Sequence, residues 1–146
     1  MSRTRPAEVR VYIDADLLGL ARVLGQLRAD VTYPGDPGAV IHKRHRPPCP
    51  ITSTAVKDHE WIPQVAGRGW LIITRDRHIQ EHRLEIAAVR DFGARMVALT
   101  AGDARSVFDQ LEVVMCRWRD LQRCLTEPAP FIYAATRTSL RKIPLT

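Results

Sequence analysis

Aspartates follow two separate apolar segments of this 146-residue chain. Asp14 comes directly after the alternating segment 9–13, and Asp76 comes two residues after the compact apolar run 70–74. In an open parallel sheet, ligands bind beyond the carboxyl ends of the strands. If the two segments are neighbouring strands, their terminal carboxylates lie within several ångströms of each other. Asp58, at the start of a short helix before the second strand, could join them from the side.

Carboxylates gathered in this way repel one another and take up protons unless a cation neutralises them. A site built from carboxylate oxygens suits Mg²⁺ or Mn²⁺. Either ion can activate water and stabilise the oxygens of a phosphodiester during hydrolysis. Each aspartate taken alone could equally be a helix cap or a loop acid. The three together predict a metal-dependent site that hydrolyses phosphodiesters.

Hydrophobic spacing predicts the elements that must position these acids. The alternation over 9–13 predicts a strand, and apolar residues at helical spacing over 17–27 predict a helix that Asp16 caps. A short strand over 31–33 comes next. The following stretch, 34–50, is rich in proline and glycine and is predicted to be a loop.

Helices and strands continue to alternate in the second half of the chain. A short helix beginning at Asp58 leads to the strand over 70–74, which we expect to be buried on both faces. A helix over 79–92 ends at Gly93 and leads to a strand over 96–99.

The remaining chain has one long amphipathic pattern and two short apolar segments. The pattern predicts a single helix over 103–125 with Asp103 as its cap, followed by a hairpin or edge strands over 131–136 and 140–145. Strands alternating with helices predict an α/β fold with a mainly parallel sheet. We expect one domain over 1–146, with a motif-bearing core at about 9–100 and the C-terminal helix and hairpin at about 103–146.

The net charge of +6 and the isoelectric point of about 9.8 favour an anionic partner, nucleic acid first. No apolar run approaches the ~20 residues that cross a bilayer, and the N-terminal segment 1–6 has no apolar stretch of the signal-peptide kind. Three cysteines without Cys-x-x-Cys spacing argue against a disulfide framework and against a thiolate zinc site. We therefore expect a cytoplasmic protein with no membrane association.

Three segments of the chain resemble the acidic motifs of a known family. They are Val11-Tyr12-Ile13-Asp14, Asp58-His59-Glu60-Trp61-Ile62 and Ile72-Ile73-Thr74-Arg75-Asp76. These motifs resemble those of PIN and PIN-like domains, above all the compact members related to the VapC-type toxins of toxin–antitoxin pairs. The resemblance covers about residues 9 to 100 and implies a three-layer α/β/α fold.

The resemblance also implies an activity and a set of roles. It implies a Mg²⁺- or Mn²⁺-dependent endoribonuclease that a cognate antitoxin holds inactive, and it makes a homodimer plausible. Asp14 and Asp58 match family metal ligands, and Asp76 matches a direct or water-mediated one. Thr74 matches the motif threonine that supports the site by hydrogen bonding.

The sequence departs from the larger PIN pattern at one position. That pattern has a further acid, usually a glutamate, on a helix between the first motif and the mid-chain motif. Residues 34–57 offer only Asp36. Glu60, as an additional metal ligand, or Asp16 could substitute, although neither matches by position. The alternative to a nuclease is therefore a non-catalytic PIN-like module that binds RNA or an antitoxin.

Basic residues provide candidate contacts to RNA. Arg75 and Arg77 flank Asp76, and an arginine guanidinium can fork onto phosphate oxygens. The densest cationic run, 42–46, precedes Asp58 and could pass near the carboxyl edge of the sheet; its candidate phosphate contacts are Lys43, Arg44 and Arg46. The alternative for this run is a solvated loop without a partner.

The segment His78-Ile79-Gln80-Glu81-His82 matches the H-x-x-E-H pattern of zinc proteases. In that alternative a zinc ion would bridge His78 and His82, and Glu81 would act as the base. Such chemistry needs a further ligand from another element and a substrate cleft. An exposed first helical turn is the simpler interpretation, and it leaves a zinc peptidase as the less favoured alternative.

Overall fold

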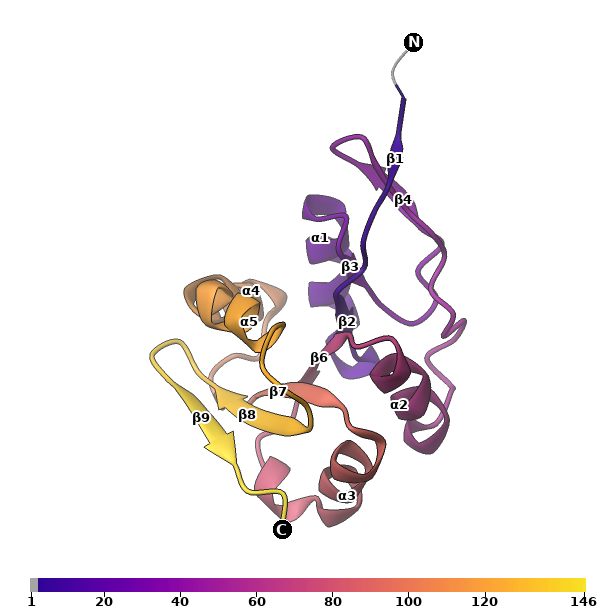
Figure 1. Cartoon of the computed structure of the whole chain (residues 1–146). Coiled ribbons are helices and arrows are strands. Elements are labelled where there is room, and N and C mark those ends of the chain that lie inside the picture. Colours follow the sequence, from indigo (N-terminus) through magenta and orange to yellow (C-terminus); the bar gives the residue numbers. More distant parts are fainter. Residues whose placement is uncertain (1–2) are drawn as a thin grey trace.

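The central feature of the computed structural model, which describes residues 3–146, is a six-stranded sheet in the order β3-β2-β6-β7-β8-β9 (Figure 1). The first five of these strands run parallel, and β9 pairs antiparallel with β8. The strands are β2 (Val11–Ile13), β3 (Val31–Thr32), β6 (Leu71–Arg75), β7 (Arg95–Leu99), β8 (Phe131–Ala135) and β9 (Leu140–Ile143). Met1 and Ser2, the first two residues of the N-terminal segment 1–6, lie outside the described residues.

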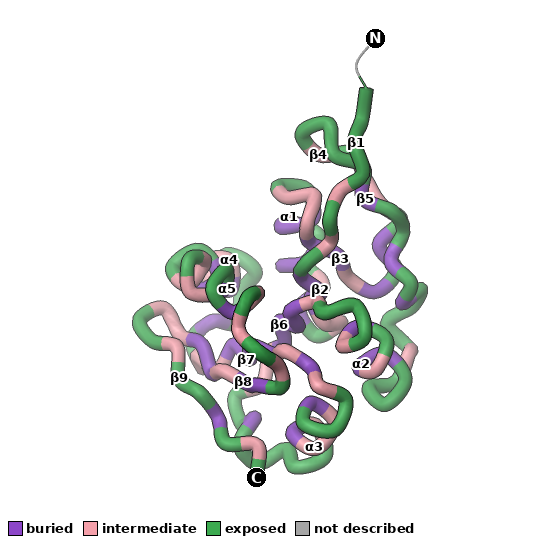
Figure 2. The backbone as a smooth tube through the Cα atoms, viewed as in Figure 1, coloured by how far each residue is buried: buried purple, intermediate pink, exposed green. Residues whose placement is uncertain are grey.

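Helices cover both faces of the sheet (Figure 1). One face carries α1 (Leu18–Leu27), α4 (Val107–Cys116) and α5 (Trp118–Cys124), and the other carries α2 (Asp58–Gly67) and α3 (Arg83–Phe92). Successive residues of β6 alternate between the two cores: Ile73 packs with the first group and Ile72 with the second. Both are fully buried, as the tube in Figure 2 shows for this strand. The three-layer α/β/α prediction is confirmed.

In the sheet, β2 lies between β3 and β6. The register pairs Val11 with Leu71 and Ile13 with Ile73, so β2 and β6 end side by side. After β2 the chain turns to one side of the sheet, and after β6 it continues on the other, which makes their carboxyl ends the topological switch point. The expectation that these two strands are neighbours is confirmed.

The single helix predicted over 103–125 is wrong, because the chain forms two helices there. Ser106 caps α4, with its side-chain oxygen accepting from the Asp109 N–H at 3.0 Å. Asp103 instead forms an ion pair with Arg137 at 3.0 Å. The helical backbone is interrupted at Arg117. The apolar stripe from Leu111 to Leu125 still packs on the core, whereas Val107 is exposed. Among residues 3–146, none of the helices is both long and apolar enough to span a bilayer.

The loop predicted over 34–50 contains a β-hairpin. Strands β4 (Ala39–Ile41) and β5 (Arg44–Arg46) pair antiparallel, and β1 (Arg5–Pro6) adds to β5 to give a small second sheet. His42 and Lys43 form the hairpin turn with φ values of 49° and 63°. In Figure 1 this hairpin and β1 extend beyond the body of the molecule. Turns with two left-handed residues usually contain Asn or Gly, so His42 and Lys43 give no sequence signal for this turn.

Arg46 fastens the hairpin to the main body. Its Nε donates to Asp36 Oδ2 at 2.6 Å, and its Nη1 donates to the carbonyl oxygens of Gly25 and Arg28, both at 3.0 Å. Thr32 donates to the same Asp36 oxygen at 2.8 Å. Arg46 and Asp36 are each only 2% exposed. The prediction that Arg46 contacts RNA is therefore wrong, because its guanidinium is buried and fully engaged.

Replacing Arg46 by methionine should strongly destabilise the protein. The substitution leaves the Asp36 carboxylate buried without its cation, and loss of one partner of a buried pair costs about 3–5 kcal/mol. Urea denaturation followed by circular dichroism measures this as a lower midpoint.

Two further variants test the cause. Arg44→Ala removes an exposed arginine from the same strand and should change the free energy of unfolding by less than about 0.5 kcal/mol. The double variant Asp36→Leu/Arg46→Met removes both charges and should be more stable than Arg46→Met alone. If the double variant is the less stable of the two, the unpaired charge is not the cause.

Candidate active site

An open pocket of about 460 Å³ lies at the carboxyl ends of β2 and β6. Five carboxylates line it, namely Asp14, Asp16, Asp58, Asp76 and Glu85. The rest of the lining consists of Thr74, Arg75, Arg77, His78 and His82. The structure thus brings the three predicted aspartates together. It also brings in Asp16, the suggested substitute for the missing PIN acid, and adds Glu85, which was not predicted.

Asp14 is held at the end of β2 by its backbone and by both carboxylate oxygens. Its N–H donates to the carbonyl of Ile73 at 2.9 Å, which continues the pairing with β6 by one residue. Its Oδ1 accepts from the Ala15 N–H at 2.7 Å, so Asp14 itself caps the 3₁₀ turn η1 (Ala15–Leu17). Its Oδ2 accepts from the Thr74 hydroxyl at 3.2 Å. Thr74 therefore supports this carboxylate from the neighbouring strand.

Asp16 is a site residue and not merely a cap. Its Oδ2 accepts from the Arg75 N–H at 3.2 Å and lies 3.1 Å from the Thr74 hydroxyl. The prediction that Asp16 caps the first helix is wrong, because Asp14 is the cap and η1 turns Asp16 back toward β6. The signal in the sequence was an acid three residues beyond the end of β2. It could not be used without knowing that a tight turn follows the strand.

Asp58 reaches the pocket from the first turn of α2. Its Oδ1 accepts from Trp61 Nε1 at 2.9 Å. The Trp61 ring is buried and lies 5.0 Å, centroid to centroid, from the ring of Tyr12 on β2. This contact fastens the start of α2 over the strand that ends at Asp14.

Glu60, on the same helix, does not join the site. It is exposed, and one carboxylate oxygen lies 3.7 Å from His59 Nε2. It lines neither the acidic pocket nor the adjoining cavity that Asp58 also lines. The prediction that Glu60 adds a metal ligand is wrong for this geometry. Two residues rotate an α-helix by about 200°, so Glu60 lies on the opposite side of α2 from Asp58.

Asp76 is fixed by the turn that follows β6. Its Oδ1 accepts from the His78 N–H at 2.9 Å, and its Oδ2 is in contact with His82 Nδ1. His78 and Glu81 are exposed, 3.9 Å apart across the 3₁₀ turn η2 (Ile79–Glu81). Among residues 3–146, the donors that cluster closely enough to hold an ion are Asp76, His82 and Glu85. The His78-Glu81-His82 zinc arrangement therefore has no support from the geometry.

Glu85 is the functional candidate that sequence reasoning missed. It lies in the first turn of α3, whose start faces the same edge of the sheet. A helix that follows β6 must begin near that edge, so an acid in its first turn was a usable signal. Two acids qualify, Glu81 and Glu85, and the 3₁₀ turn before α3 shifts the helical phase. Only the structure shows that Glu85 is the one facing the pocket.

Burial and neighbouring negative charges raise the pKa values of three of these carboxylates. Burial, followed by the charges of Asp76, Asp58 and Asp14, raises the pKa of Glu85 to about 7. Burial and the charge of Asp14 raise the pKa of Asp16 to about 6, although Asp16 is exposed at the pocket mouth. Burial also raises the pKa of Asp14. A site of this kind needs protons or a cation, and its carboxylate-rich donor set fits a divalent metal ion.

Two arginines provide positive charge beside the acids. Arg75 and Arg77 both line the pocket. The Nε of Arg75 is buried and, within the described chain, has no hydrogen-bond partner. Neither arginine forms an ion pair with a pocket carboxylate in residues 3–146. Both guanidinium groups are therefore available to an anion.

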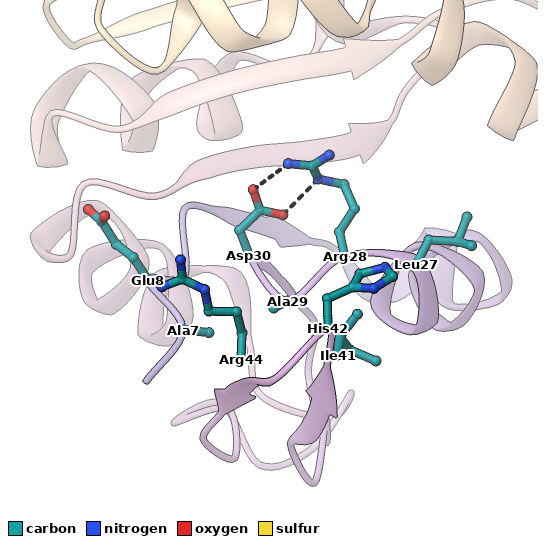
Figure 3. Close-up of a pocket in the computed structure, with 9 residues that line it drawn as sticks. All are labelled: Ala7, Glu8, Leu27, Arg28, Ala29, Asp30, Ile41, His42 and Arg44. Carbon is teal, nitrogen blue, oxygen red and sulfur yellow. Dashed lines mark hydrogen bonds and ion pairs between the residues drawn. The ribbon is translucent and has the colours of Figure 1, made fainter. Parts of the chain in front are cut away.

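Lys43 and Arg44 lie at the other edge of the sheet. Arg44 and His42 line a separate pocket of about 380 Å³ together with Glu8 and the ion pair between Arg28 and Asp30 (Figure 3). Several of these residues directly precede β2 or β3, so the pocket lies at the amino ends of the strands. The expectation that the 42–46 run passes the carboxyl edge is wrong. The buried Arg46 ties the hairpin to the C-terminal end of α1, at the far edge.

The family described as "PIN like domain" matches residues 9–101 of the chain. The matched span runs from before β2 to just beyond β7 and includes all five pocket carboxylates. The chain belongs to the PIN-like domain family. The resemblance read from the acidic motifs is confirmed.

One curated relative supports the same assignment. VapC45 of Mycobacterium tuberculosis, whose name classes it provisionally as a ribonuclease, is 28% identical over 93 residues. The match takes in 61% of this chain and 64% of that protein, so less than two thirds of the relative is covered. No solved structure matches the chain significantly. The relative therefore places the chain near the VapC-type proteins through its motif-bearing core.

The metal-free protein should lose stability as the pH rises from about 5 to 7.5. The folded-state pKa of Glu85 is raised from 4.5 to about 7, and that of Asp16 from 3.8 to about 6. In both cases the protonated form favours folding, so the stabilisation is present at low pH and is lost as the pH rises through these values. Thermal unfolding in EDTA at constant ionic strength measures the slope.

The variant Glu85→Gln cannot ionise at that position and should give a shallower decline in Tm than the parent. Glu81→Gln removes an exposed acid from the adjacent turn and should leave the slope unchanged. Equal slopes in the parent and in Glu85→Gln would show that the Glu85 carboxylate does not feel the pocket charges.

Proposed function

We propose that this chain is a cytoplasmic, Mg²⁺- or Mn²⁺-dependent endoribonuclease that hydrolyses RNA phosphodiester bonds. We propose further that it is the toxin of a type II toxin–antitoxin pair. The observation that carries the proposal is the convergence of five carboxylates at the switch point of a PIN-like sheet. Membership of the PIN-like domain family and the similarity to VapC45 support the same conclusion.

The residues present fit a divalent ion, which Asp14, Asp58 and Asp76 would hold with help from the neighbouring acids. When bound, such an ion supplies positive charge that activates water and neutralises the phosphate. The chain's own contribution is to fix the carboxylates beforehand. Asp14 is held by Ala15 and Thr74, Asp58 by Trp61, and Asp76 by the His78 N–H. Preorganised ligands cost little rearrangement during the reaction.

Asp16 is placed to move a proton. Its carboxylate lies at the exposed mouth of the pocket, next to Asp14, and has a pKa raised to about 6. A carboxylate with a pKa near the working pH is a competent general base. We propose that the Asp16 carboxylate accepts the proton of the attacking water.

The arginines that flank Asp76 are the candidates for binding the substrate. Arg75 and Arg77 line the same open pocket, so a phosphate there meets both guanidinium groups and the acid cluster. The net charge of +6 favours a polyanion such as RNA over a neutral substrate. We propose that Arg75 and Arg77 grip the phosphates on either side of the scissile bond. Lys43 and Arg44 would contact only RNA that also reaches the far edge of the sheet.

Partners follow from the same proposal. A VapC-type toxin implies a cognate antitoxin that restrains it, and a homodimer is compatible with that assignment. The alternative is a non-catalytic PIN-like module that binds RNA or an antitoxin. The alternative is motivated by Asp36, the only acid in residues 34–57, whose carboxylate is paired with Arg46 and cannot serve as the missing PIN acid.

The variant Asp14→Asn should reduce RNA cleavage by at least about 100-fold with little change in fold, because the amide keeps the shape but removes the charge. Cleavage of labelled RNA in Mn²⁺ or Mg²⁺, followed on denaturing gels, measures the rate. Asp91→Asn, an exposed acid near the C-terminal end of α3, is the matched control and should cleave like the parent. A parent that binds RNA but never cuts it would favour the non-catalytic module, and an Asp14→Asn variant as fast as the parent would remove Asp14 from the mechanism.

Arg77→Ala should weaken RNA binding and reduce its salt dependence. Each lost phosphate contact on a single strand lowers the slope of log K against log salt by about 0.7. Fluorescence anisotropy in EDTA measures both quantities while the RNA stays intact. Arg44→Ala, at the opposite edge, should change neither for a short oligonucleotide. A larger effect from Arg44 than from Arg77 would contradict the proposed path of the RNA.

A further inference from the structure

We propose that Asp76, His82 and Glu85 form a mixed carboxylate–imidazole metal site that makes this chain prefer Mn²⁺ to Mg²⁺. The inference deepens the proposed function, because it concerns the metal of the same pocket and rests on that pocket holding one. Ion binding can nevertheless be measured without RNA. The two proposals can therefore fail separately.

The three side chains come from consecutive elements that meet at the pocket. Asp76 follows β6, His82 follows η2, and Glu85 lies in the first turn of α3. One donor atom from each lies within 4.8 Å of the others. Two donors on opposite sides of an ion at about 2.1 Å are about 4.2 Å apart. The spacing of the three donors is therefore close to what one ion requires, once the touching Asp76 and His82 atoms separate around it.

Asp76 and His82 contact each other, whereas Glu85 has no partner among the described residues. Asp76 Oδ2 already touches His82 Nδ1, and the Asp76 side chain is only 9% exposed. Glu85 is half-buried, and within residues 3–146 no hydrogen bond or ion pair engages its carboxylate. Asp76, Asp58 and Asp14 face it with negative charge. A half-buried carboxylate surrounded by acids and lacking a donor needs a positive ion.

The imidazole decides which ion fits. Mg²⁺ binds oxygen ligands in strict octahedral geometry and keeps much of its water. Imidazole nitrogen binds divalent first-row transition metals, and Mn²⁺ is the member of that series that also suits carboxylate oxygen. The oxygen donors of Asp14, Asp16 and Asp58 suit either ion, so His82 is the residue that separates them.

The same geometry gives a new role to one histidine of the H-x-x-E-H segment. His82 is the residue before α3 and Glu85 is the third residue of that helix, and both line the pocket. His78 also lines the pocket, but its Nδ1 lies 3.9 Å from Glu81, and neither residue belongs to the cluster of donors found in residues 3–146. The segment thus contributes one histidine to a site whose carboxylates come from Asp76 and Glu85.

Binding of Mn²⁺ and Mg²⁺ to the metal-stripped full chain tests the proposal. Titration calorimetry should show Mn²⁺ binding at least about 10-fold more tightly than Mg²⁺. Pulsed electron paramagnetic resonance of bound Mn²⁺ should show coupling to a nitrogen nucleus. In His82→Ala the nitrogen coupling should vanish, and the affinity ratio should fall to within about threefold of unity.

His59→Ala is the matched control, because it removes an exposed imidazole from α2 outside the pocket. It should keep both the nitrogen coupling and the affinity ratio. Glu85→Gln should weaken both ions and keep the nitrogen coupling of any Mn²⁺ that binds. Circular dichroism and the Tm in EDTA check that each variant folds.

The inference is overturned if bound Mn²⁺ in the parent shows no nitrogen coupling, or if His82→Ala keeps the parent's affinity ratio. In the latter case His82 is only a hydrogen-bond partner of Asp76. Should the parent bind Mn²⁺ through nitrogen yet cut no RNA, the proposed function fails and the metal site stands. Should the parent cut RNA with a metal preference that ignores His82, the nuclease stands and the metal site fails.

Discussion

The pairing of β2 with β6 is the constraint on which the site depends. The ladder that joins Ile13 to Ile73 continues through the Asp14 N–H and the Ile73 carbonyl, so it sets Asp14 beside Thr74. A slip of one residue would turn every side chain of β6 to the opposite face of the sheet. The two apolar cores prevent this, because each accepts only alternate residues of the strand. Packing on both faces thus fixes the position of the charged groups at the edge.

The parts of the site that sequence reasoning found are those that depend on strand ends. Asp14 and Asp76 follow apolar segments, and parallel strands bring their carboxyl ends to one edge whatever the details of the turns. Asp16 and Glu85 depend instead on the short 3₁₀ turns η1 and η2, which change the direction of a side chain without changing the hydrophobic pattern. Periodicity carries no information about such turns. Glu85 was therefore not predicted, and Asp16 was named only as a substitute acid that matches no family position.

The sequence-based expectation for the cationic run 42–46 was wrong in both its place and the exposure of Arg46. Local composition does not distinguish among the five neighbouring polar residues. Arg46 is nevertheless buried in an ion pair with Asp36, whereas Arg44 is exposed and lines a surface pocket. The difference comes from residues 10 to 21 positions away along the chain, which no local pattern contains. The same anchoring holds the hairpin at the amino edge of the sheet. Charge density in the sequence therefore predicted neither the place nor the exposure of these side chains.

The Thr74 hydroxyl has one hydrogen and two carboxylate neighbours, Asp14 and Asp16. It can donate to only one of them at a time, and the other must then donate a proton of its own or go without the bond. A proton taken up here belongs to the pair and to neither residue alone. Whatever changes the charge of one aspartate therefore changes the hydrogen bonding of the other through a single rotating hydroxyl. At this strand end, the smallest unit that gains or loses charge is a group of three side chains.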